Sequence, residues 1–313
     1  MDTKMNKYLF GPVQSRRYGR SLGVDLSIPK TCDFSCRFCQ LGPTPRTTVE
    51  RVDNPPIREV LDELERWARE GGVADFITEA GSGEPTLHPH FGEVFRWARE
   101  RTGTRTLLLS NGSLFFLPEV RREAAGADVV KVSLHAWDQA SFMEVTQAHE
   151  SLRLSTIIEG YRRFREEYTG RLDLEVFILP GINDRPDQAE KIAKLAASFS
   201  PDSITLNTAV RPPADSSVKA CPPEVIETLL PLFGPHAHAG GKEPPIVVQP
   251  LSEEALVGLV DRHPVSLGVL AHTFSKPEKE MRALLERLAA GKRIQLFSRE
   301  GELFAGPSGE SCR

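Results

Sequence analysis

The chain has 313 residues, of which 40% are hydrophobic and 26% are charged, and its formal net charge is −4 at pH 7. This composition excludes a largely disordered chain, gives no overall positive charge to attract a nucleic acid, and allows one large domain with one small one. Since no apolar run is long enough to cross a bilayer, we expect a cytoplasmic protein with no membrane partner.

Strands and helices are predicted to alternate from about residue 22 to residue 210. The predicted strands cover residues 23–28, 75–79, 104–109, 128–134, 174–179 and 203–207. The predicted helices between them cover residues 57–69, 92–101, 139–147, 154–168 and 187–198. Six βα units in this order predict an α/β fold, namely a partial (β/α)6 TIM-like barrel over residues 1–210.

The composition changes after residue 210. Nine of the 24 prolines fall between residues 211 and 250, which predicts a packed connector around one helix at 223–233. The rest of the chain, 251–313, predicts a small winged helix-turn-helix domain, with helices at 253–261, 266–274 and 277–290 and a β-ribbon at 293–305. This domain holds nine Lys or Arg and nine Asp or Glu. Because duplex binding needs a basic face, we do not expect it to bind DNA.

Three cysteines, Cys32, Cys36 and Cys39, lie in the loop after the first predicted strand, separated by three and two residues. Three thiolates can hold three irons of a 4Fe–4S cluster and leave the fourth iron open, whereas electron-transfer clusters usually take four cysteines. A zinc site would need a fourth Cys or His, usually in a second knuckle, and no paired CxxC is present. A disulfide framework fits less well, because five cysteines are few and odd in number and we expect no secretory leader ahead of them.

With the aromatic Phe38 directly before the third cysteine, this loop resembles the signature of the radical S-adenosylmethionine (SAM) superfamily. The resemblance implies a 4Fe–4S cluster on Cys32, Cys36 and Cys39 whose open iron chelates the amino and carboxylate groups of SAM. It implies that one electron cleaves SAM to a 5′-deoxyadenosyl radical, which takes a hydrogen atom from a substrate. It also implies a partner reductase such as flavodoxin or ferredoxin.

Active sites of parallel α/β barrels lie at the carboxyl ends of the strands. The glycines of residues 80–88, after the second predicted strand, allow the backbone to approach a ligand closely. This segment resembles the Gly-Gly-Glu motif of the superfamily, which implies that Gly81, Ser82 and Gly83 bind SAM while Glu84 receives its ammonium group. The alternative is an ordinary βα turn with a solvated glutamate.

Polar residues also follow the later strands: Asn111 the third, Ser133 and His135 the fourth, and Asn207 the sixth. The resemblance implies that they present polar side chains to SAM. Three roles are open for His135, which are to bond the ribose, to serve the substrate or to pack in the core. Asn207 and Arg211 could reach the substrate or the cofactor carboxylate, residues 179–184 resemble the adenine-side loop of the superfamily, and no residue is predicted as catalytic.

Upstream of the cysteines, residues 1–50 hold eight Lys or Arg against four Asp or Glu, with Arg16, Arg17 and Arg20 close together. A positive rim suits an anionic substrate or a phosphate backbone. The alternative is that these side chains form salt bridges at the barrel edge.

The barrel from residue 10 to residue 213 resembles the radical SAM proteins related to tRNA wyosine-base synthases, which modify an N-methylated guanine of tRNA and hold a second cluster on additional upstream cysteines. Here no cysteine precedes Cys32, and Cys221 and Cys312 are isolated, so a second three-cysteine cluster is not expected. The resemblance therefore implies the cofactor chemistry rather than the substrate.

The leading hypothesis is a radical SAM enzyme that modifies a tRNA base or another nucleotide-like substrate. One alternative is a peptide- or protein-modifying radical SAM enzyme that captures its substrate with the C-terminal domain. The other alternative is a winged-helix redox regulator that carries an iron–sulfur cluster.

Overall fold

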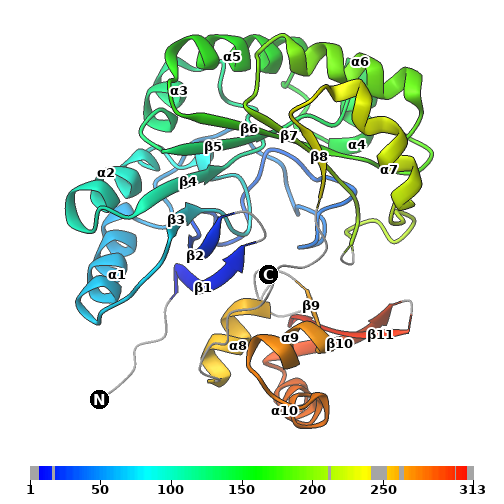
Figure 1. The fold of residues 1–313 in the computed structure, drawn as a ribbon. Helices are drawn as coiled ribbons and strands as arrows, with labels where there is room; N and C mark the ends of the chain where they lie inside the picture. The colour runs from blue at the N-terminus through cyan, green and yellow to red at the C-terminus, as the bar shows by residue number, and fades with distance from the viewer. Residues whose placement is uncertain are drawn as a thin grey trace.

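The computed structural model describes residues 7–15, 18–210, 213–240, 252–260, 264–299 and 301–308. Its larger part is one eight-stranded sheet in which the strands lie side by side in chain order, from β1 to β8 (Figure 1). The strands are β1 (Leu9–Ser15), β2 (Gly19–Val24), β3 (Phe76–Glu79), β4 (Arg105–Leu109), β5 (Val129–Ser133), β6 (Arg171–Phe177), β7 (Ser203–Asn207) and β8 (Ala237–Ala239). β1 pairs antiparallel with β2 and every later neighbour pairs parallel, so the α/β prediction is confirmed in this curved, parallel sheet.

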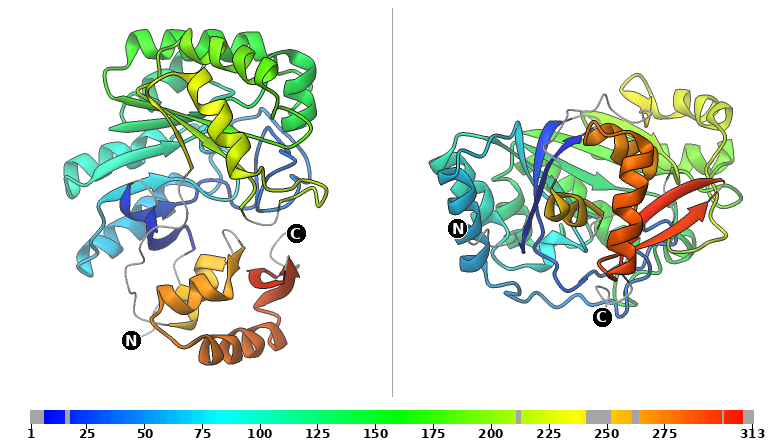
Figure 2. Two further views of the ribbon diagram at one scale, coloured as in Figure 1. Left: turned by 45° about the vertical axis from the view of Figure 1, so that its right-hand side comes forward. Right: turned by 90° about the horizontal axis from the view of Figure 1, so that it is seen from below.

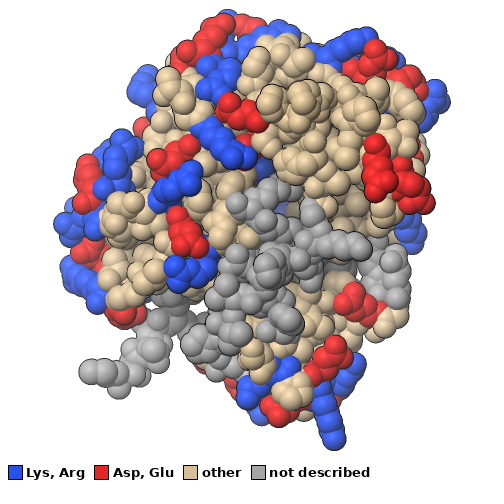
Figure 3. All heavy atoms as spheres, in the orientation of Figure 1, with Lys and Arg blue, Asp and Glu red and all other residues tan. Residues whose placement is uncertain are grey.

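Helices cover the outer face of this sheet (Figure 1). They are α1 (Ile57–Arg69), α2 (Gly92–Arg101), α3 (Pro118–Ala124), α4 (Gln139–Thr146), α5 (Leu154–Glu167), α6 (Pro186–Ala197) and α7 (Pro223–Leu229), with short 3-10 turns at Pro85–Leu87 and Leu230–Phe233. α1 shows why they form, because Ile57, Val60 and Leu64 share one helical face and are buried. On the visible face of the molecule, positive and negative side chains alternate over the outer helices (Figure 3).

The alternation of side chains along β5 separates the two faces of the sheet. Val130 and Val132 are fully buried in the main core, between sheet and helices. Lys131 and Ser133 point the other way and line a cavity inside the curved sheet. Strands of this kind therefore supply the core with one set of side chains and the site with the other.

The described residues between 252 and 308 form a separate small unit with its own hydrophobic core, which includes Leu256, Leu270 and Leu285. Its elements are α8 (Glu253–Val260), β9 (Val265–Ser266), α9 (Leu267–Thr273), α10 (Glu278–Ala290), β10 (Ile294–Arg299) and β11 (Glu302–Pro307). The three strands form an antiparallel sheet in the order β10, β11, β9. This unit lies beside the β1–β2 hairpin in the views of Figures 1 and 2, and Val13 of β1 packs against its core.

All six predicted barrel strands and all five predicted barrel helices are present, but the first strand is displaced. It covers Gly19–Val24 rather than 23–28, because the Asp25 carboxylate accepts a hydrogen bond from the Ser27 amide at 3.0 Å and turns the chain. Strands β1 and β8 and helix α3 were not predicted. β8 lies within the segment assigned to the connector, and the winged helix-turn-helix assignment stays a prediction.

None of the helices in the described ranges is long and apolar enough to span a membrane.

Candidate active site

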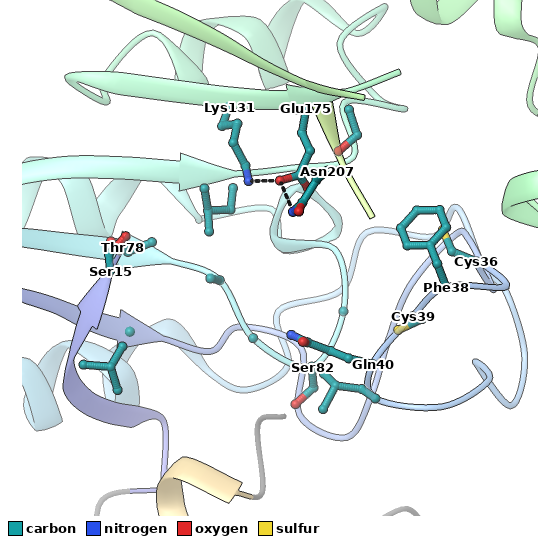
Figure 4. A pocket seen from close by; sticks show the side chains of 18 of the residues that line it. Ser15, Cys36, Phe38, Cys39, Gln40, Thr78, Ser82, Lys131, Glu175 and Asn207 are labelled. Carbon is teal, nitrogen blue, oxygen red and sulfur yellow. Dashed lines mark hydrogen bonds and ion pairs between the residues drawn. The ribbon is translucent and has the colours of Figure 1, made fainter. Parts of the chain in front are cut away.

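A cavity of about 600 Å³ lies inside the curved sheet, at the carboxyl ends of its strands. The cysteine loop, the β3 turn, the inward side chains of β4 to β7 and the C-terminal unit all contribute to its wall. Six of the predicted SAM-binding residues line it, namely Phe38, Gly81, Ser82, Gly83, Ser133 and Asn207. Figure 4 shows Cys36, Phe38 and Cys39 on one side of the cavity and Lys131, Glu175 and Asn207 on another.

The thiols of Cys32, Cys36 and Cys39 also line this cavity, and all three residues are partly exposed. Removal from bulk water raises the pKa of the Cys32 and Cys36 thiols. The Lys30 ammonium donates a hydrogen bond to the Cys39 sulfur at 3.4 Å.

Within the described ranges, no three His, Cys, Asp or Glu side chains converge as ligands of one metal ion. Cluster cysteines each bind a different iron, so they need not converge on one point. Three thiols on one loop, facing a common cavity, fit a 4Fe–4S cluster with one open iron.

The cysteine loop is fastened to the loop after β4 by a buried carboxylate. Asp33, fully buried, accepts hydrogen bonds from the Asn111 side-chain amide at 2.6 Å and from the Ser113 hydroxyl. Two backbone bonds secure the other side, where the Ser35 and Arg37 amides donate to carbonyls at the end of α4. Asp33 was not predicted. Its only signal in the sequence is its place beside Cys32.

The turn after β3 packs directly on the cysteine loop. A Cβ atom on Gly83 would lie 1.7 Å from the Thr31 carbonyl oxygen, so only glycine fits at this position. The Ser82 amide and hydroxyl both donate to the Asp25 carboxylate at the end of β2, at 3.1 and 2.7 Å. These contacts hold the Gly81–Gly83 backbone at the cavity wall.

Glu84 lies behind this wall and is buried. Its Oε1 accepts hydrogen bonds from the Thr86 amide and hydroxyl and from the Ser110 hydroxyl, at 3.0, 2.7 and 2.6 Å. Its Oε2 accepts one from the Asn111 amide at 2.7 Å. The pKa of Glu84 is raised, because the effect of burial outweighs that of these hydrogen bonds, which lower it. The carboxylate thus holds the loops after β3 and β4 together. The alternative of a solvated glutamate does not fit, because Glu84 is buried.

Asn111 and His135 also lie behind the lining. The Tyr161 hydroxyl lies 2.7 and 2.8 Å from the carbonyl oxygens of Asn111 and Ser133, so one side chain holds both strand-end loops. His135 accepts a hydrogen bond from the Phe177 amide at its Nδ1, at 2.9 Å, and burial lowers its pKa to about 4. Among the three roles left open for His135, this geometry is that of a packed, neutral histidine.

Phe38 stacks on Phe177 with ring centroids 4.1 Å apart and meets the His135 ring edge to face at 4.9 Å. These rings join the cysteine loop to the end of β6. The adjoining loop, 179–184, is held in place by Asn183. Its side-chain oxygen accepts a hydrogen bond from the Leu179 amide, and its side-chain nitrogen donates to the carbonyls of His135 and Phe177.

Three inward side chains of successive strands form a polar cluster in the cavity. The Lys131 ammonium lies 2.9 Å from Glu175 Oε1, and the Asn207 amide donates to the same oxygen at 3.3 Å (Figure 4). Only Asn207 of the three was predicted. Lys131 could have been found from its register, since it shares the inward face of β5 with Ser133.

Of the three arginines of the predicted positive rim, only Arg20 lies within the described residues. Arg20 forms an exposed ion pair with Asp75 at 3.2 Å, as the salt-bridge alternative expects. Arg16, Arg17, Arg211 and Cys312 lie outside the described residues. Cys221 is buried, and its backbone amide donates to the Thr208 hydroxyl.

Comparison with known proteins supports the family that the cysteine loop resembles. A family model described as the radical SAM superfamily matches residues 26–196. A UPF0026 protein of Helicobacter pylori is 35% identical over 226 residues, which cover 71% of this chain and 72% of that protein. A dual-specificity RNA methyltransferase RlmN of Syntrophobacter fumaroxidans is 28% identical over 62% of this chain and 59% of that protein.

A GTPase Obg of Brachyspira hyodysenteriae is 29% identical over 92% of this chain, but the chain spans only 43% of that relative. Among solved structures, a radical SAM methyltransferase from Sphaerobacter thermophilus matches with a TM-score of 0.52 at 20% identity, over 70% of this chain and 65% of that one. SuiB of Streptococcus suis bound to S-adenosylmethionine matches with a TM-score of 0.51 at 15% identity, over 68% and 48%. At these identities the structures show the shared fold alone. From the family model and the UPF0026 relative, the chain belongs to the radical SAM superfamily.

Proposed function

We propose that this protein is a radical SAM enzyme whose substrate is an RNA base or another nucleotide-like molecule. Membership of the superfamily makes it an enzyme that uses a 4Fe–4S cluster and SAM. The observation that carries the assignment of the site is the three-cysteine loop facing a cavity of about 600 Å³ at the strand ends. The substrate class rests on similarity to a relative that is an RNA methyltransferase. The closer grouping with wyosine synthases stays a prediction.

Cys32, Cys36 and Cys39 would hold the cluster, and SAM bound at its open iron would supply a carbon-centred radical by one-electron cleavage. The chain itself positions the reactants. The Lys30 ammonium bonds the Cys39 sulfur and so orients it, and the Gly81–Gly83 backbone lets a ligand approach closely. Apolar side chains of the cavity wall, such as Leu107, Leu109 and Phe177, limit the access of water that would quench reactive species.

Among the other predicted SAM-binding residues, we propose that Phe38, Ser82, Ser133 and Asn207 contact the cofactor or substrate, because they line the cavity. Glu84, Asn111 and His135 are proposed as positioning residues. Their polar atoms bond protein groups, and they hold the loops after β3, β4 and β5.

For residues 252–308 we propose a winged-helix domain that closes the cavity. Its order of elements is helix, strand, two helices and two strands, with a three-stranded antiparallel sheet. Leu259 of α8, Val265 of β9, and Val269 and Thr273 of α9 line the same cavity as the cysteines, which supports a role for this unit in closing the cavity. With equal numbers of acidic and basic residues in the predicted domain, DNA binding is not proposed. A reductase such as flavodoxin or ferredoxin and a cytoplasmic location complete the proposal.

The proposed substrate class is tested by stimulated turnover. Anaerobically reconstituted protein is incubated with SAM, dithionite and, in separate reactions, total tRNA, mixed nucleoside monophosphates or a peptide fraction. We expect tRNA or the nucleotides to increase 5′-deoxyadenosine formation and to yield a nucleoside of altered mass. Stimulation by the peptide fraction alone would overturn the proposal in favour of a peptide-modifying enzyme, and the absence of stimulation by both nucleic-acid fractions would also contradict it.

A further inference from the structure

The polar cluster of Lys131, Glu175 and Asn207 has no part in holding the cysteine loop. Its members come from the inward faces of β5, β6 and β7, and all three point into the cavity (Figure 4). Lys131 lies two residues before Ser133, so it is deeper in the barrel than the strand-end loops. The cluster therefore lies deeper in the barrel than the region where the cysteine loop and the β3 turn meet.

Stability does not explain this ion pair. The Lys131 and Glu175 side chains are only 15% and 19% exposed, and the neighbouring wall includes the apolar Leu107 and Leu109. Removing two charges from water costs several kcal/mol per ion, which their attraction offsets only partly, so a buried ion pair is weak evidence for stabilisation. A few polar groups in an apolar cavity are, in contrast, what fixes the orientation of a bound small molecule.

The chemistry of the cluster restricts what it can bind. Lys131 has three N–H donors, of which one meets Glu175, so others can reach an acceptor on a ligand. The amide oxygen of Asn207, which accepts from the Thr208 amide at 3.1 Å, and the carboxylate of Glu175 are acceptors beside this donor, and an oxygen acceptor has more than one lone pair.

The matching group is planar, has a carbonyl or ring nitrogen next to an N–H, and has apolar faces that pack against leucines such as Leu107 and Leu109. Resting on the proposed function, we propose that Lys131, Glu175 and Asn207 bind the polar edge of the substrate's nucleobase. The three side chains then select the base and hold it deeper in the barrel than the cofactor.

The test is equilibrium dialysis of guanosine, adenosine, uridine and cytidine against the full chain, reconstituted with its cluster and loaded with SAM but without reductant. At least one nucleoside should bind saturably to the wild-type protein. Lys131→Met and Glu175→Gln should each weaken its binding about tenfold or more, because the first removes a charged donor and the second replaces a charged acceptor by a neutral amide. Lys131→Arg keeps the positive donor and should recover part of the affinity.

Matched controls come from the exposed ion pair between Glu190 and Lys194 on α6, 3.0 Å apart. Glu190→Gln and Lys194→Met make the same chemical changes outside the cavity and should bind the nucleoside as the wild type does. Equal iron content and absorbance spectra show that each variant folds and holds its cluster.

Two results would overturn the inference. If a nucleoside binds but Lys131→Met and Glu175→Gln bind it equally well, the cluster does not recognise the base, while the proposed function stands. If no nucleoside binds to the wild type, the inference fails. The turnover assay with tRNA then decides separately whether the proposed function fails with it.

Discussion

Asn111 donates a hydrogen bond from its side-chain amide to the Asp33 carboxylate at 2.6 Å, and this bond joins the loop after β4 to the loop that carries the cysteines. The Ser113 hydroxyl bonds the other carboxylate oxygen. Asp33 is thus a buried acceptor for two donors from one neighbouring loop, and the position of Cys32 depends on it.

The first prediction concerns this anchor. Asp33→Asn places an amide N–H₂ against one of the two donors and loses an acceptor, so the free energy of unfolding should fall by about 1–3 kcal/mol. Iron content after reconstitution should fall as well, because the loop is no longer held. Thermal unfolding and iron analysis measure both, with the exposed Asp62→Asn as the control. Wild-type iron content in Asp33→Asn would show that the anchor is not needed.

The second prediction uses the contact between the β3 turn and the cysteine loop. Gly83→Ala puts a methyl group into the Thr31 carbonyl, so the turn must move, and we expect a loss of stability of about 2 kcal/mol or more. Gly258→Ala in α8 is the matched control, since its Cβ meets nothing within 4 Å and alanine favours a helix. Denaturant unfolding of the two variants checks this, and equal stability would refute the close packing.

The third prediction concerns Glu79 at the end of β3. It is fully buried, and within the described part of the chain neither carboxylate oxygen has a hydrogen-bond partner. Burial, with Glu123 and Glu84 nearby, raises the pKa of Glu79 well above its usual value, so the folded state keeps a proton that the unfolded chain loses above about pH 4.5.

Glu79→Gln should therefore raise the free energy of unfolding by about 1–3 kcal/mol at pH 7. The gain should shrink as the pH falls towards 4.5, where the unfolded chain also binds the proton. Chemical unfolding at several pH values measures it, and the exposed Glu119→Gln should show no such dependence. A gain that does not change with pH would contradict the account.

The fourth prediction concerns His135. Burial lowers its pKa to about 4, so the folded state holds the neutral ring while the unfolded chain binds a proton below about pH 6.5. The stability that this histidine contributes is complete above pH 6.5 and is lost as the pH falls towards 4. His135→Asn keeps an acceptor for the Phe177 amide but cannot titrate, so its stability should fall less between these pH values. An unchanged slope would argue against a buried neutral histidine.

Much of the barrel could be predicted, because the β-branched strands and the apolar face of helices such as α1 carry clear periodicity. β8 is only three residues long and lies in a proline-rich segment, too short for a pattern. β1 contains Gly11 and Pro12, which are residues that normally argue against a strand. Helix α3 offers little apolar periodicity, since most of its residues are charged or small.

In the site, the cysteines were predictable because their spacing is local. Lys131 could have been placed in the cavity from its register with Ser133, but its pairing with Glu175 could not be predicted, and neither could the role of Asp33, because these contacts join segments far apart in the chain. Glu84 was predicted from its motif, but the four bonds that it accepts become visible only when the loops after β3 and β4 are brought together.

The central claim is tested most directly by reductive cleavage of SAM. Anaerobically reconstituted wild-type protein with SAM and dithionite should form 5′-deoxyadenosine, Cys36→Ala should form none, and Cys221→Ala, which changes a cysteine outside the cavity, should match the wild type. A cluster that assembles and is reduced but never cleaves SAM, or 5′-deoxyadenosine formation that persists in Cys36→Ala, would contradict the account.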